Sequence, residues 1–284
     1  MSAIGEAEKR TQCRVARLFV DELGYEHLGN LIDSDNRNII EGQLEHFLRA
    51  YQGYGEREDG EDLMRRAIAE VVKIAGNTGV SLYDRNRDVY ALLRYGVKVK
   101  ADVGAQFETV WLIDWKNPEK NRFAIAEEVT VKPADLKAHG KRPDIVLYVN
   151  GIALGVLELK RSTVSVAEGI RQNLDNQKKE FIQPFFSTMQ YVMAGNDTEG
   201  LRYGTIQTPE KYYLTWKENP PPGHEADNPL DHALRQLCGK RRFLELIHDF
   251  VVFDAGTKKL CRHNQYFGVR AAQEHVRRRE GGIL

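Results

Sequence analysis

Three charged residues near the middle of the chain have the types and the spacing of a hydrolytic metal site. Asp144, which follows a proline, is separated by thirteen residues from the run Glu158-Leu159-Lys160. Glu158 and Lys160 are two apart in a strand-like run, so their side chains point to one face, while Leu159 points to the other. Two carboxylates suit a hard divalent cation such as Mg²⁺. Such an ion lowers the pKa of a bound water, and a neighbouring lysine stabilises the negative charge that develops on an attacked phosphodiester.

A β-hairpin must position these residues, because two strand-like runs flank Asn150-Gly151, a typical hairpin turn. A regular two-residue turn places Asp144 opposite Leu157, so that it faces away from Glu158. A three-residue loop, Val149–Gly151, or a bulge inside either strand brings both carboxylates to one face. The catalytic hypothesis therefore predicts such a loop or a bulge.

The elements around the hairpin follow from hydrophobic spacing and end signals. A helix over 166–182 begins with the capping box Ser165–Glu168. Residues 1–80 are predicted to be mostly helical, with one helix that ends at Gly24, one that begins after Ser34-Asp35-Asn36 and one over 61–75. Strands are predicted over 110–115 and 123–131. Further helices are predicted over 229–254 and 265–279. This succession predicts an α/β fold with a mixed central sheet flanked by helices.

The composition is that of an ordinary folded protein. The 284 residues include 41 Lys plus Arg and 41 Asp plus Glu, so the formal net charge is zero and nucleic-acid binding must come from local sites. Hydrophobic residues make up 42% of the chain, enough for a core without disulfides. The three cysteines form no C-x-x-C pair, which argues against a zinc knuckle and for a reduced, cytoplasmic protein. A run of about 18 apolar residues, which a membrane span needs, does not occur in the sequence.

Taken alone, the pattern of Asp144, Glu158 and Lys160 is a weak signal, because alternating strands often expose glutamate and lysine to solvent. Motifs of other chemistry were not found in the sequence: there is no phosphate-binding G-x-x-x-x-G-K-[ST], no G-x-S-x-G and no H-E-x-x-H. The sequence therefore predicts no ATP site in this chain.

The wider sequence resembles a known family. Arg142–Gly151 and Val156–Lys160 resemble the PD-(D/E)-x-K motif in the nuclease region of the restriction (R) subunit of type I restriction-modification enzymes. Further similar segments are Leu82–Gly96, Ile113–Phe123, Gly169–Gln177, Phe250–Asp254 and His263–Phe267. The resemblance covers nearly the whole chain. It implies a restriction-endonuclease-like (PD-(D/E)-x-K) core and the activity of a type I site-specific deoxyribonuclease.

The resemblance also implies roles for individual residues. Asp144 and Glu158 take the places of the metal ligands, and Lys160 that of the catalytic lysine. The family often has a Q-x-x-x-Y motif on the next helix, and Gln172 takes the glutamine place, although position 176 is Asn. A shifted alternative pairs Gln177 with Phe181, and Gln172 is preferred because it lies closer to the strand.

Such folds often add an acidic residue from an early helix, for which Glu8 and Glu41 are candidates. Glu127 and Glu128 lie on a strand that could border the site. All four are more often solvated residues, so we expect at most a supporting role for them.

The resemblance further predicts a domain division and partners. Residues 1–220 are the expected endonuclease domain and 221–284 a helical connector after the proline run in Asn219–Gly223. The end at Gly281-Gly282 resembles the strand that leads into an ATP-driven motor, where Gln265 would take part in nucleotide recognition. The implied cofactor is Mg²⁺, with ATP in the longer protein, and the implied partners are double-stranded DNA and the methyltransferase (M) and specificity (S) subunits.

Two alternatives stay open at this stage. The chain could be a PD-(D/E)-x-K nuclease of another DNA-processing system, such as repair or recombination. It could also be a docking module with a vestigial nuclease site, although the intact Asp144, Glu158 and Lys160 argue against that.

Overall fold

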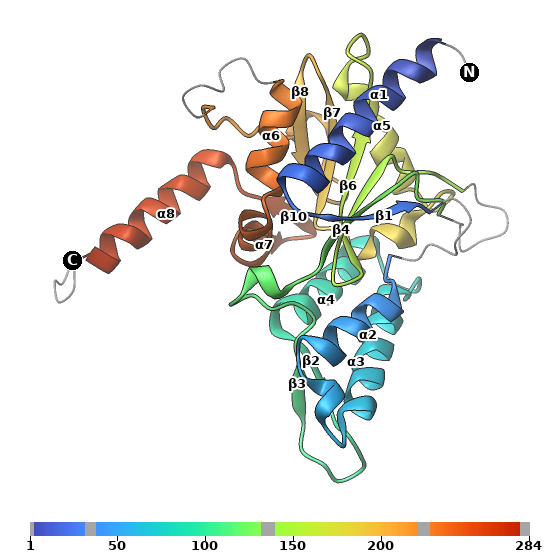
Figure 1. Cartoon of the computed structure of the whole chain (residues 1–284), viewed down its shortest axis with the longest axis vertical. Coiled ribbons are helices and arrows are strands. Elements are labelled where there is room, and N and C mark those ends of the chain that lie inside the picture. Colours follow the sequence, from blue (N-terminus) through green and yellow to red (C-terminus); the bar gives the residue numbers. More distant parts are fainter. Residues whose placement is uncertain (1–2, 32–37, 132–139, 221–227, 279–284) are drawn as a thin grey trace.

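A mixed six-stranded sheet forms the centre of the described part of the chain (Figure 1). The computed structural model describes residues 3–31, 38–131, 140–220 and 228–278. The strands follow the order β1-β4-β5-β6-β7-β8. Their bounds are β1 Glu26–Asn30, β4 Phe123–Glu127, β5 Ile145–Val149, β6 Ile152–Leu159, β7 Tyr191–Asn196 and β8 Gly200–Gly204. The pairs β1–β4 and β6–β7 are parallel and the others antiparallel, so the sheet is mixed as predicted.

The inner strands are covered on both faces, which explains why their sequences are mostly apolar, with Glu158 as the charged residue of β6. Every residue of β5, β6 and β7 is buried. One face packs against α1 (Ala3–Arg17), α6 (Pro229–Cys238) and α7 (Lys240–Asp249) in the main core. The other face packs against α5 (Val166–Asn176) and the 3-10 turn Gln183–Ser187.

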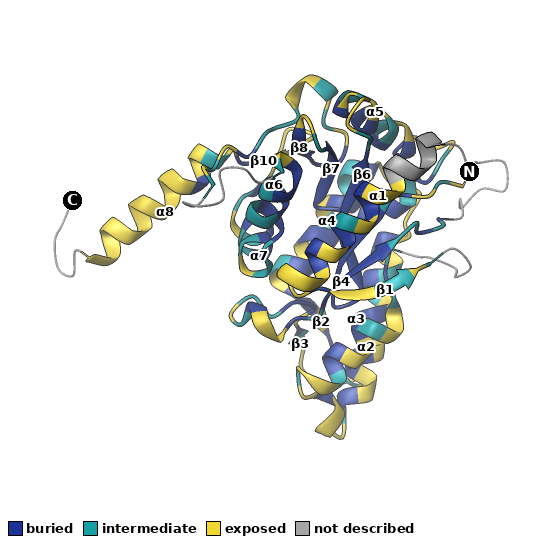
Figure 2. Cartoon of the chain, turned by 45° about the horizontal axis from the view of Figure 1, so that its top comes forward, coloured by how far each residue is buried: buried dark blue, intermediate teal, exposed yellow. Residues whose placement is uncertain are grey.

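A helical lobe, which we define as residues 41–110, extends from the lower end of the sheet in Figure 1. It contains α2 Glu41–Ala50, α3 Gly60–Ala75, α4 Leu82–Tyr95 and the antiparallel ribbon β2 Val97–Val99 and β3 Glu108–Val110. Inward-facing apolar residues of α2 and α3 join the main core, while their outer faces are exposed (Figure 2).

The residues after the proline run pack on the same core as the sheet. Leu234 of α6 and Leu246 of α7 are fully buried there. A second hairpin, β9 Val251–Asp254 and β10 Thr257–Leu260, follows, and α8 (His263–Arg278) then extends away from the body (Figure 1). Most of α8 is exposed, and Tyr266 is its buried residue (Figure 2). Within the described ranges, no helix has the length and apolarity needed to cross a membrane.

Several predicted elements need correction. The run 110–115 does not belong to the central sheet, because β3 ends at Val110 and the chain then turns, with Asp114 accepting bonds from the amides of Lys116 and Asn117. The helix predicted over 229–254 is broken at Gly239 and gives way to β9 at Val251. The helix predicted over 166–182 ends at Asn176, and strand β1 was not predicted. The capping residues 34–36 lie outside the described residues.

Candidate active site

The β5–β6 hairpin has a tight turn and a bulge. Asn150 and Gly151 have φ of 51° and 81°, so the turn contains two residues, and Val149 pairs with Ile152. The predicted three-residue loop is therefore wrong. The bulge, which was the other alternative, is confirmed further along the strands, and it changes which residues stand opposite one another.

The bulge adds one residue to β6. Tyr148 pairs with Ala153. One residue further from the turn, Leu147 pairs with Gly155, so Leu154 has no partner on β5 and is the extra residue. Leu154 lies in the main core, and a Cβ at Gly155 would lie 3.5 Å from Phe243 in that same core. Leu154 and Gly155, two successive residues of β6, thus face the same side of the sheet. From Gly155 onward, each residue of β6 lies on the opposite face from the one that it would have in a regular hairpin.

The exchanged register brings the two carboxylates together. Ile145 pairs with Leu157, so the preceding Asp144 stands opposite Glu158 at the end of the pair. Both lie on the face that α5 covers. The carboxylate of Asp144 is held by the backbone amide of Leu159, which donates to its Oδ2 at 2.7 Å.

Lys160 and Gln172 complete the group. Lys160 Nζ lies 3.0 Å from Glu158 Oε1 and donates to Gln172 Oε1 at 2.8 Å. The Lys160 side chain is 14% exposed, so it is reached by solvent, whereas that of Glu158 is 1% exposed. All four residues predicted for the site therefore converge.

The shifted alternative for the glutamine lies elsewhere. The Gln177 amide donates to the carbonyl of Asn173, and its oxygen accepts from the amide of Gln207. The ring of Phe181 contacts Lys141, at 4.1 Å from its centroid. The structure thus brings Gln172, and not Gln177, to the predicted lysine.

The electrostatics of Glu158 favour a bound cation. Burial raises the pKa of this carboxyl well above its usual value, the charge of Asp144 raises it further, and Lys160 acts in the opposite direction. Glu158 Oε2 is buried and receives no hydrogen bond from an amide, hydroxyl or ammonium group of the described residues, while the Asp144 carboxyl lies within hydrogen-bond reach of Glu158. A divalent ion would satisfy this oxygen and relieve the repulsion between the two carboxylates. The donor set therefore fits Mg²⁺, which commonly takes one or two carboxylates and fills its other positions with water and phosphate.

Helix α5 lies unusually close to the site because Gly169 has no side chain. A Cβ there would lie 3.1 Å from Ala194 Cβ and 3.5 Å from the Cγ atoms of both Glu158 and Lys160. Gln172 is three residues further on the same helix, so this close contact sets its distance from Lys160.

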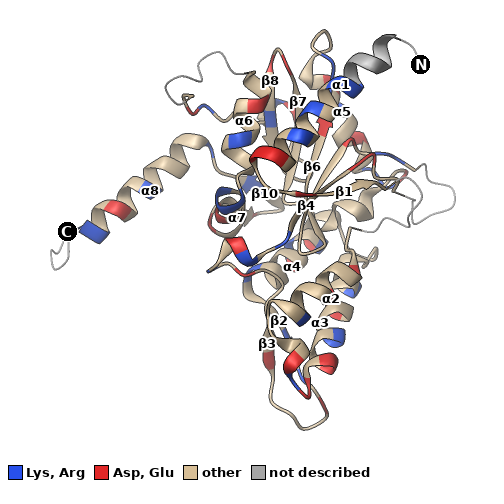
Figure 3. Cartoon of the chain, viewed as in Figure 1, with Lys and Arg blue, Asp and Glu red and all other residues tan. Residues whose placement is uncertain are grey.

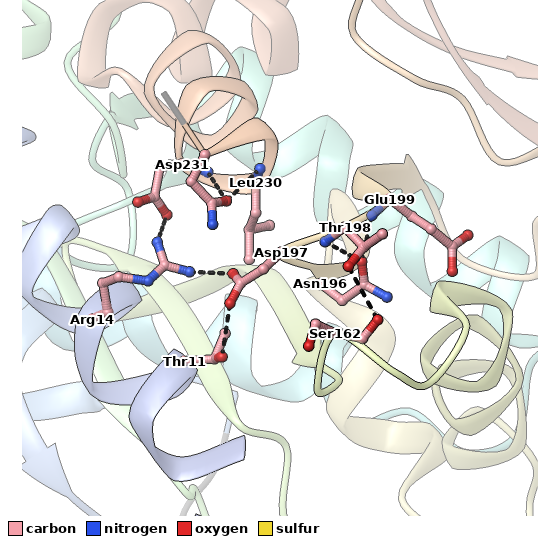
Figure 4. Close-up of polar contacts among 10 residues, drawn as sticks. Thr11, Arg14, Ser162, Asn196, Asp197, Thr198, Glu199, Leu230 and Asp231 are labelled. Atoms are coloured by element: carbon pink, nitrogen blue, oxygen red, sulfur yellow. Dashed lines mark hydrogen bonds and ion pairs between the residues drawn. The ribbon is translucent and has the colours of Figure 1, made fainter. Parts of the chain in front are cut away.

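Polar contacts fix the loop between Lys160 and α5, and Figure 4 shows the one between Thr198 and Ser162. The Asn196 amide donates to the carbonyl of Val164 at 2.7 Å, and the Thr198 hydroxyl donates to that of Ser162 at 3.1 Å. Glu199 Oε1 accepts from the amide of Val166, the first residue of α5, at 3.0 Å. The β7–β8 turn therefore holds both ends of this loop.

The same turn is tied to helices α1 and α6. Arg14 of α1 forms ion pairs with Asp197 in the turn and with Asp231 of α6, and Thr11 donates to Asp197 at 3.3 Å (Figure 4). Helices α1 and α6 thus support the site through the β7–β8 turn.

The acidic candidates of β4 lie beside Asp144: Gln12 donates to the Asp144 carbonyl at 3.4 Å, and the Glu128 amide donates to it at 2.9 Å. Glu127 is held by Gln12 at 3.0 Å and His27 at 2.8 Å, and Glu128 lies near Lys9 and Arg142. The expected supporting role of both residues stays a prediction.

The early-helix candidates give a different result. Glu41 begins α2, whose first turn packs on Gly151, so it lies at the opposite end of the hairpin from Asp144. The side chain of Glu8 lies outside the described residues. No cluster of three or more His, Cys, Asp and Glu side chains suited to a metal occurs in the described part of the chain.

Sequence reasoning missed the groups that hold the site together. The amide of Leu159 carries no sequence signal, because every residue except proline has one. Gly169 has a signal, a glycine inside a predicted helix, which often marks close packing. Asn196 also has one, since asparagine between two strands favours a turn.

Comparison with known proteins decides the family. A family described as the type I restriction enzyme R protein N terminus matches residues 6–211, most of the chain. The chain belongs to this family.

Similar curated proteins are endonuclease subunits of type I restriction enzymes. The HindI endonuclease subunit of Haemophilus influenzae is 28% identical over 74% of this chain and 21% of its own length. The putative MjaVIIIP endonuclease subunit of Methanocaldococcus jannaschii is 26% identical over 90% of this chain and 24% of its own length. The chain thus spans about a fifth to a quarter of the length of these relatives, and the resemblance seen in the sequence is confirmed.

Proposed function

We propose that this R protein N-terminal chain is a Mg²⁺-dependent endonuclease region that hydrolyses phosphodiester bonds of double-stranded DNA, with a restriction-endonuclease-like core and the activity of a type I site-specific deoxyribonuclease. The observation that carries the proposal is the bulge in β6. It places Asp144 opposite Glu158 beside Lys160, which a regular hairpin would prevent.

Each residue of the site has a task in this proposal. Asp144 and Glu158 would hold Mg²⁺, which supplies a water of lowered pKa and polarises the phosphate. Lys160 places a positive charge where the negative charge of the transition state develops. Gln172 accepts a hydrogen bond from Lys160 and is a positioning residue, since it fixes the direction of the ammonium.

The wider context is also part of the proposal. In a longer protein the chain would work beside an ATP-driven motor and assemble with the M and S subunits in the cytoplasm. ATP would bind to that motor, and this chain would need Mg²⁺ alone. The division into an endonuclease domain, 1–220, and a connector, 221–284, stays a prediction.

Metal-dependent nicking of supercoiled plasmid tests the proposal. We expect the chain, alone or assembled with its partner subunits, to nick DNA with Mg²⁺ or Mn²⁺ and not with EDTA, and Lys160→Ala to lose this activity. Lys178→Ala is the matched control, because Lys178 is exposed and pairs with Asp175 away from the site. Equal nicking by Lys160→Ala and wild type would refute the assignment. An assembled complex that never nicks DNA would favour the docking-module alternative.

A further inference from the structure

A basic groove lies on the helical lobe, far from the candidate active site. It has a volume of about 720 Å³ and is formed by α3, the end of α4 and β2. In Figures 1 and 2 this part of the lobe lies at the opposite end of the molecule from α5. The charged residues that line it are Arg66, Lys73, Lys98, Lys100 and Glu70. Four cations thus face one carboxylate.

The charges of the groove differ from those of the rest of the lobe, where positive and negative side chains alternate (Figure 3). Elsewhere on the lobe, exposed arginines are neutralised. The pairs are Arg49 with Glu45 and Glu61, Arg57 with Asp59 and Glu108, Arg65 with Asp62, and Arg87 with Asp84 and Asp88. In the groove, Lys73 pairs with Glu70, but Arg66, Lys98 and Lys100 form no ion pair with any described residue. Positive charge is therefore concentrated at this place on a chain whose net charge is zero.

Exposed aromatic rings border these cations. Tyr95 is 64% and Phe107 is 69% exposed, and both line the groove. Lys100 Nζ lies 4.6 Å from the centroid of the Phe107 ring. Cations beside exposed rings are the combination with which proteins hold nucleic-acid strands, by pairing with phosphates and by contact with sugars and bases.

The spacing of two lysines at β2 matches that of successive phosphates along one nucleic-acid strand. Lys98 lies on β2 and Lys100 is the first residue after it, and both are more exposed than the buried Val99 between them. Two residues of extended chain span about 6.6 Å. This is close to the distance between successive phosphates in a nucleic-acid strand. We propose that the basic groove binds the sugar–phosphate backbone of DNA that flanks the cleavage site. The inference rests on the proposed nuclease function, which supplies DNA as the polyanion.

The groove has a clear limit at the tip of the lobe. A neighbouring cavity that shares Arg66 is lined by Glu58, Asp59, Asp62 and Asp102. The sign of the charge changes there, so the DNA would follow β2 and leave along α3, away from the tip.

The experiment compares two variants with the same change in net charge. Lys98→Gln/Lys100→Gln removes two positive charges, and Arg65→Glu replaces a positive charge by a negative one, so each variant changes the net charge by −2. Arg65 is an exposed α3 residue outside the groove lining. Binding of a short fluorescein-labelled duplex is followed by anisotropy in EDTA over a range of salt concentrations. We expect the double variant to weaken binding about ten-fold and to lower the salt slope by nearly two, while Arg65→Glu stays within about two-fold of wild type.

Three results would overturn the inference. These are no duplex binding by the wild type, unchanged binding by the double variant, or equal weakening by both variants. If DNA binding is unchanged but assembly with other subunits is lost, the groove binds a protein instead. All three side chains lie at the surface, so thermal unfolding should be unchanged and a folding defect can be recognised.

Plasmid nicking with Mg²⁺ separates this inference from the proposed function. If the wild type nicks DNA but the double variant binds duplex normally, the groove assignment fails and the nuclease stands. If the double variant loses duplex binding but the wild type never nicks DNA, the nuclease fails and the groove stands.

Discussion

Two β-hairpins of this chain, β5–β6 and β9–β10, begin alike and end with different chemistry. Both turns place two residues at positive φ: Asn150 and Gly151 at 51° and 81°, and Ala255 and Gly256 at 45° and 80°. The β9–β10 hairpin then stays in register to its end, whereas β5–β6 is shifted by the bulge at Leu154. One extra residue thus separates a regular hairpin from one that gathers Asp144 and Glu158.

Each hairpin also carries a lysine that is largely withdrawn from solvent. Lys160 lies beside the carboxylate of Glu158 and keeps some solvent access. Lys258 is buried, and its ammonium group contacts Asn86 Oδ1, Gln190 Oε1 and the Met189 carbonyl at 2.8, 2.7 and 3.2 Å. Burial without a carboxylate lowers the pKa of Lys258 well below its usual value.

The difference teaches how to distinguish two kinds of buried lysine. A lysine beside paired carboxylates at an accessible edge can act on a substrate. A lysine enclosed by neutral acceptors holds one element against another, as Lys258 holds the β9–β10 hairpin against α4 and the segment before β7.

The largest expected effect separates the two lysines by activity. In the assembled enzyme, Lys160→Ala should lower DNA cleavage by about a hundred- to a thousand-fold, because a donor to the developing charge is lost. Asp144→Ala and Glu158→Ala should also abolish cleavage. In the longer protein proposed above, ATP hydrolysis and translocation by the motor should continue in all three variants. The free energy of unfolding should change little, since two neighbouring carboxylates without metal repel each other.

Lys258→Met is the matched control for that experiment. It should cleave DNA at the wild-type rate, as measured by plasmid nicking. A loss of cleavage in Lys258→Met as large as in Lys160→Ala would contradict the distinction between the hairpins.

The sequence predicted the hairpin but not the residue that gives it its function. Asn150-Gly151 marks the turn in the sequence, because both positions need positive φ. The catalytic hypothesis required a loop or a bulge, but the sequence did not show that the bulge lies at Leu154. Because β6 is buried on both faces, it has no alternation of apolar and polar residues that a bulge would interrupt.

The same limits explain the errors elsewhere in the fold. Strand β1, with the sequence EHLGN, lies at an edge and is largely exposed, so its residues lack a hydrophobic pattern. Val251 and Phe253 continue the apolar spacing of α7, so the start of β9 could not be recognised from the sequence. The residues that contact Lys258 are distant from it in sequence, so its burial could not be predicted from the sequence.

The second effect is on stability and depends on pH. At about pH 10, Lys258→Met should be less stable than wild type by about 2–3 kcal/mol, because the neutral amine of Lys258 can donate two hydrogen bonds and its buried acceptors lose them. As the pH falls, the unfolded lysine takes up a proton before the buried one does. Wild type should therefore lose stability, and the gap should narrow by up to about 1.4 kcal/mol per pH unit.

Urea unfolding at several pH values measures this gap. Lys259→Met is the control, because Lys259 is exposed and pairs with Asp254 in the same hairpin. A gap that does not change with pH would show that Lys258 stays protonated when buried, and that three neutral acceptors suffice for an ammonium group.

The smallest expected effect tests the close approach of α5 to the site hairpin at Gly169. Gly169→Ala should lower cleavage about ten-fold, because α5 must move away from Ala194 and Gln172 must then move away from Lys160. Ala194→Gly removes the nearest atom, so the double variant Gly169→Ala/Ala194→Gly should regain most of the activity. Binding of duplex DNA should be equal in all three proteins, since the loss concerns the lysine and not the groove. If the double variant is no more active than Gly169→Ala, the helix is not what orients Lys160, and the carboxylate of Glu158 must do so alone.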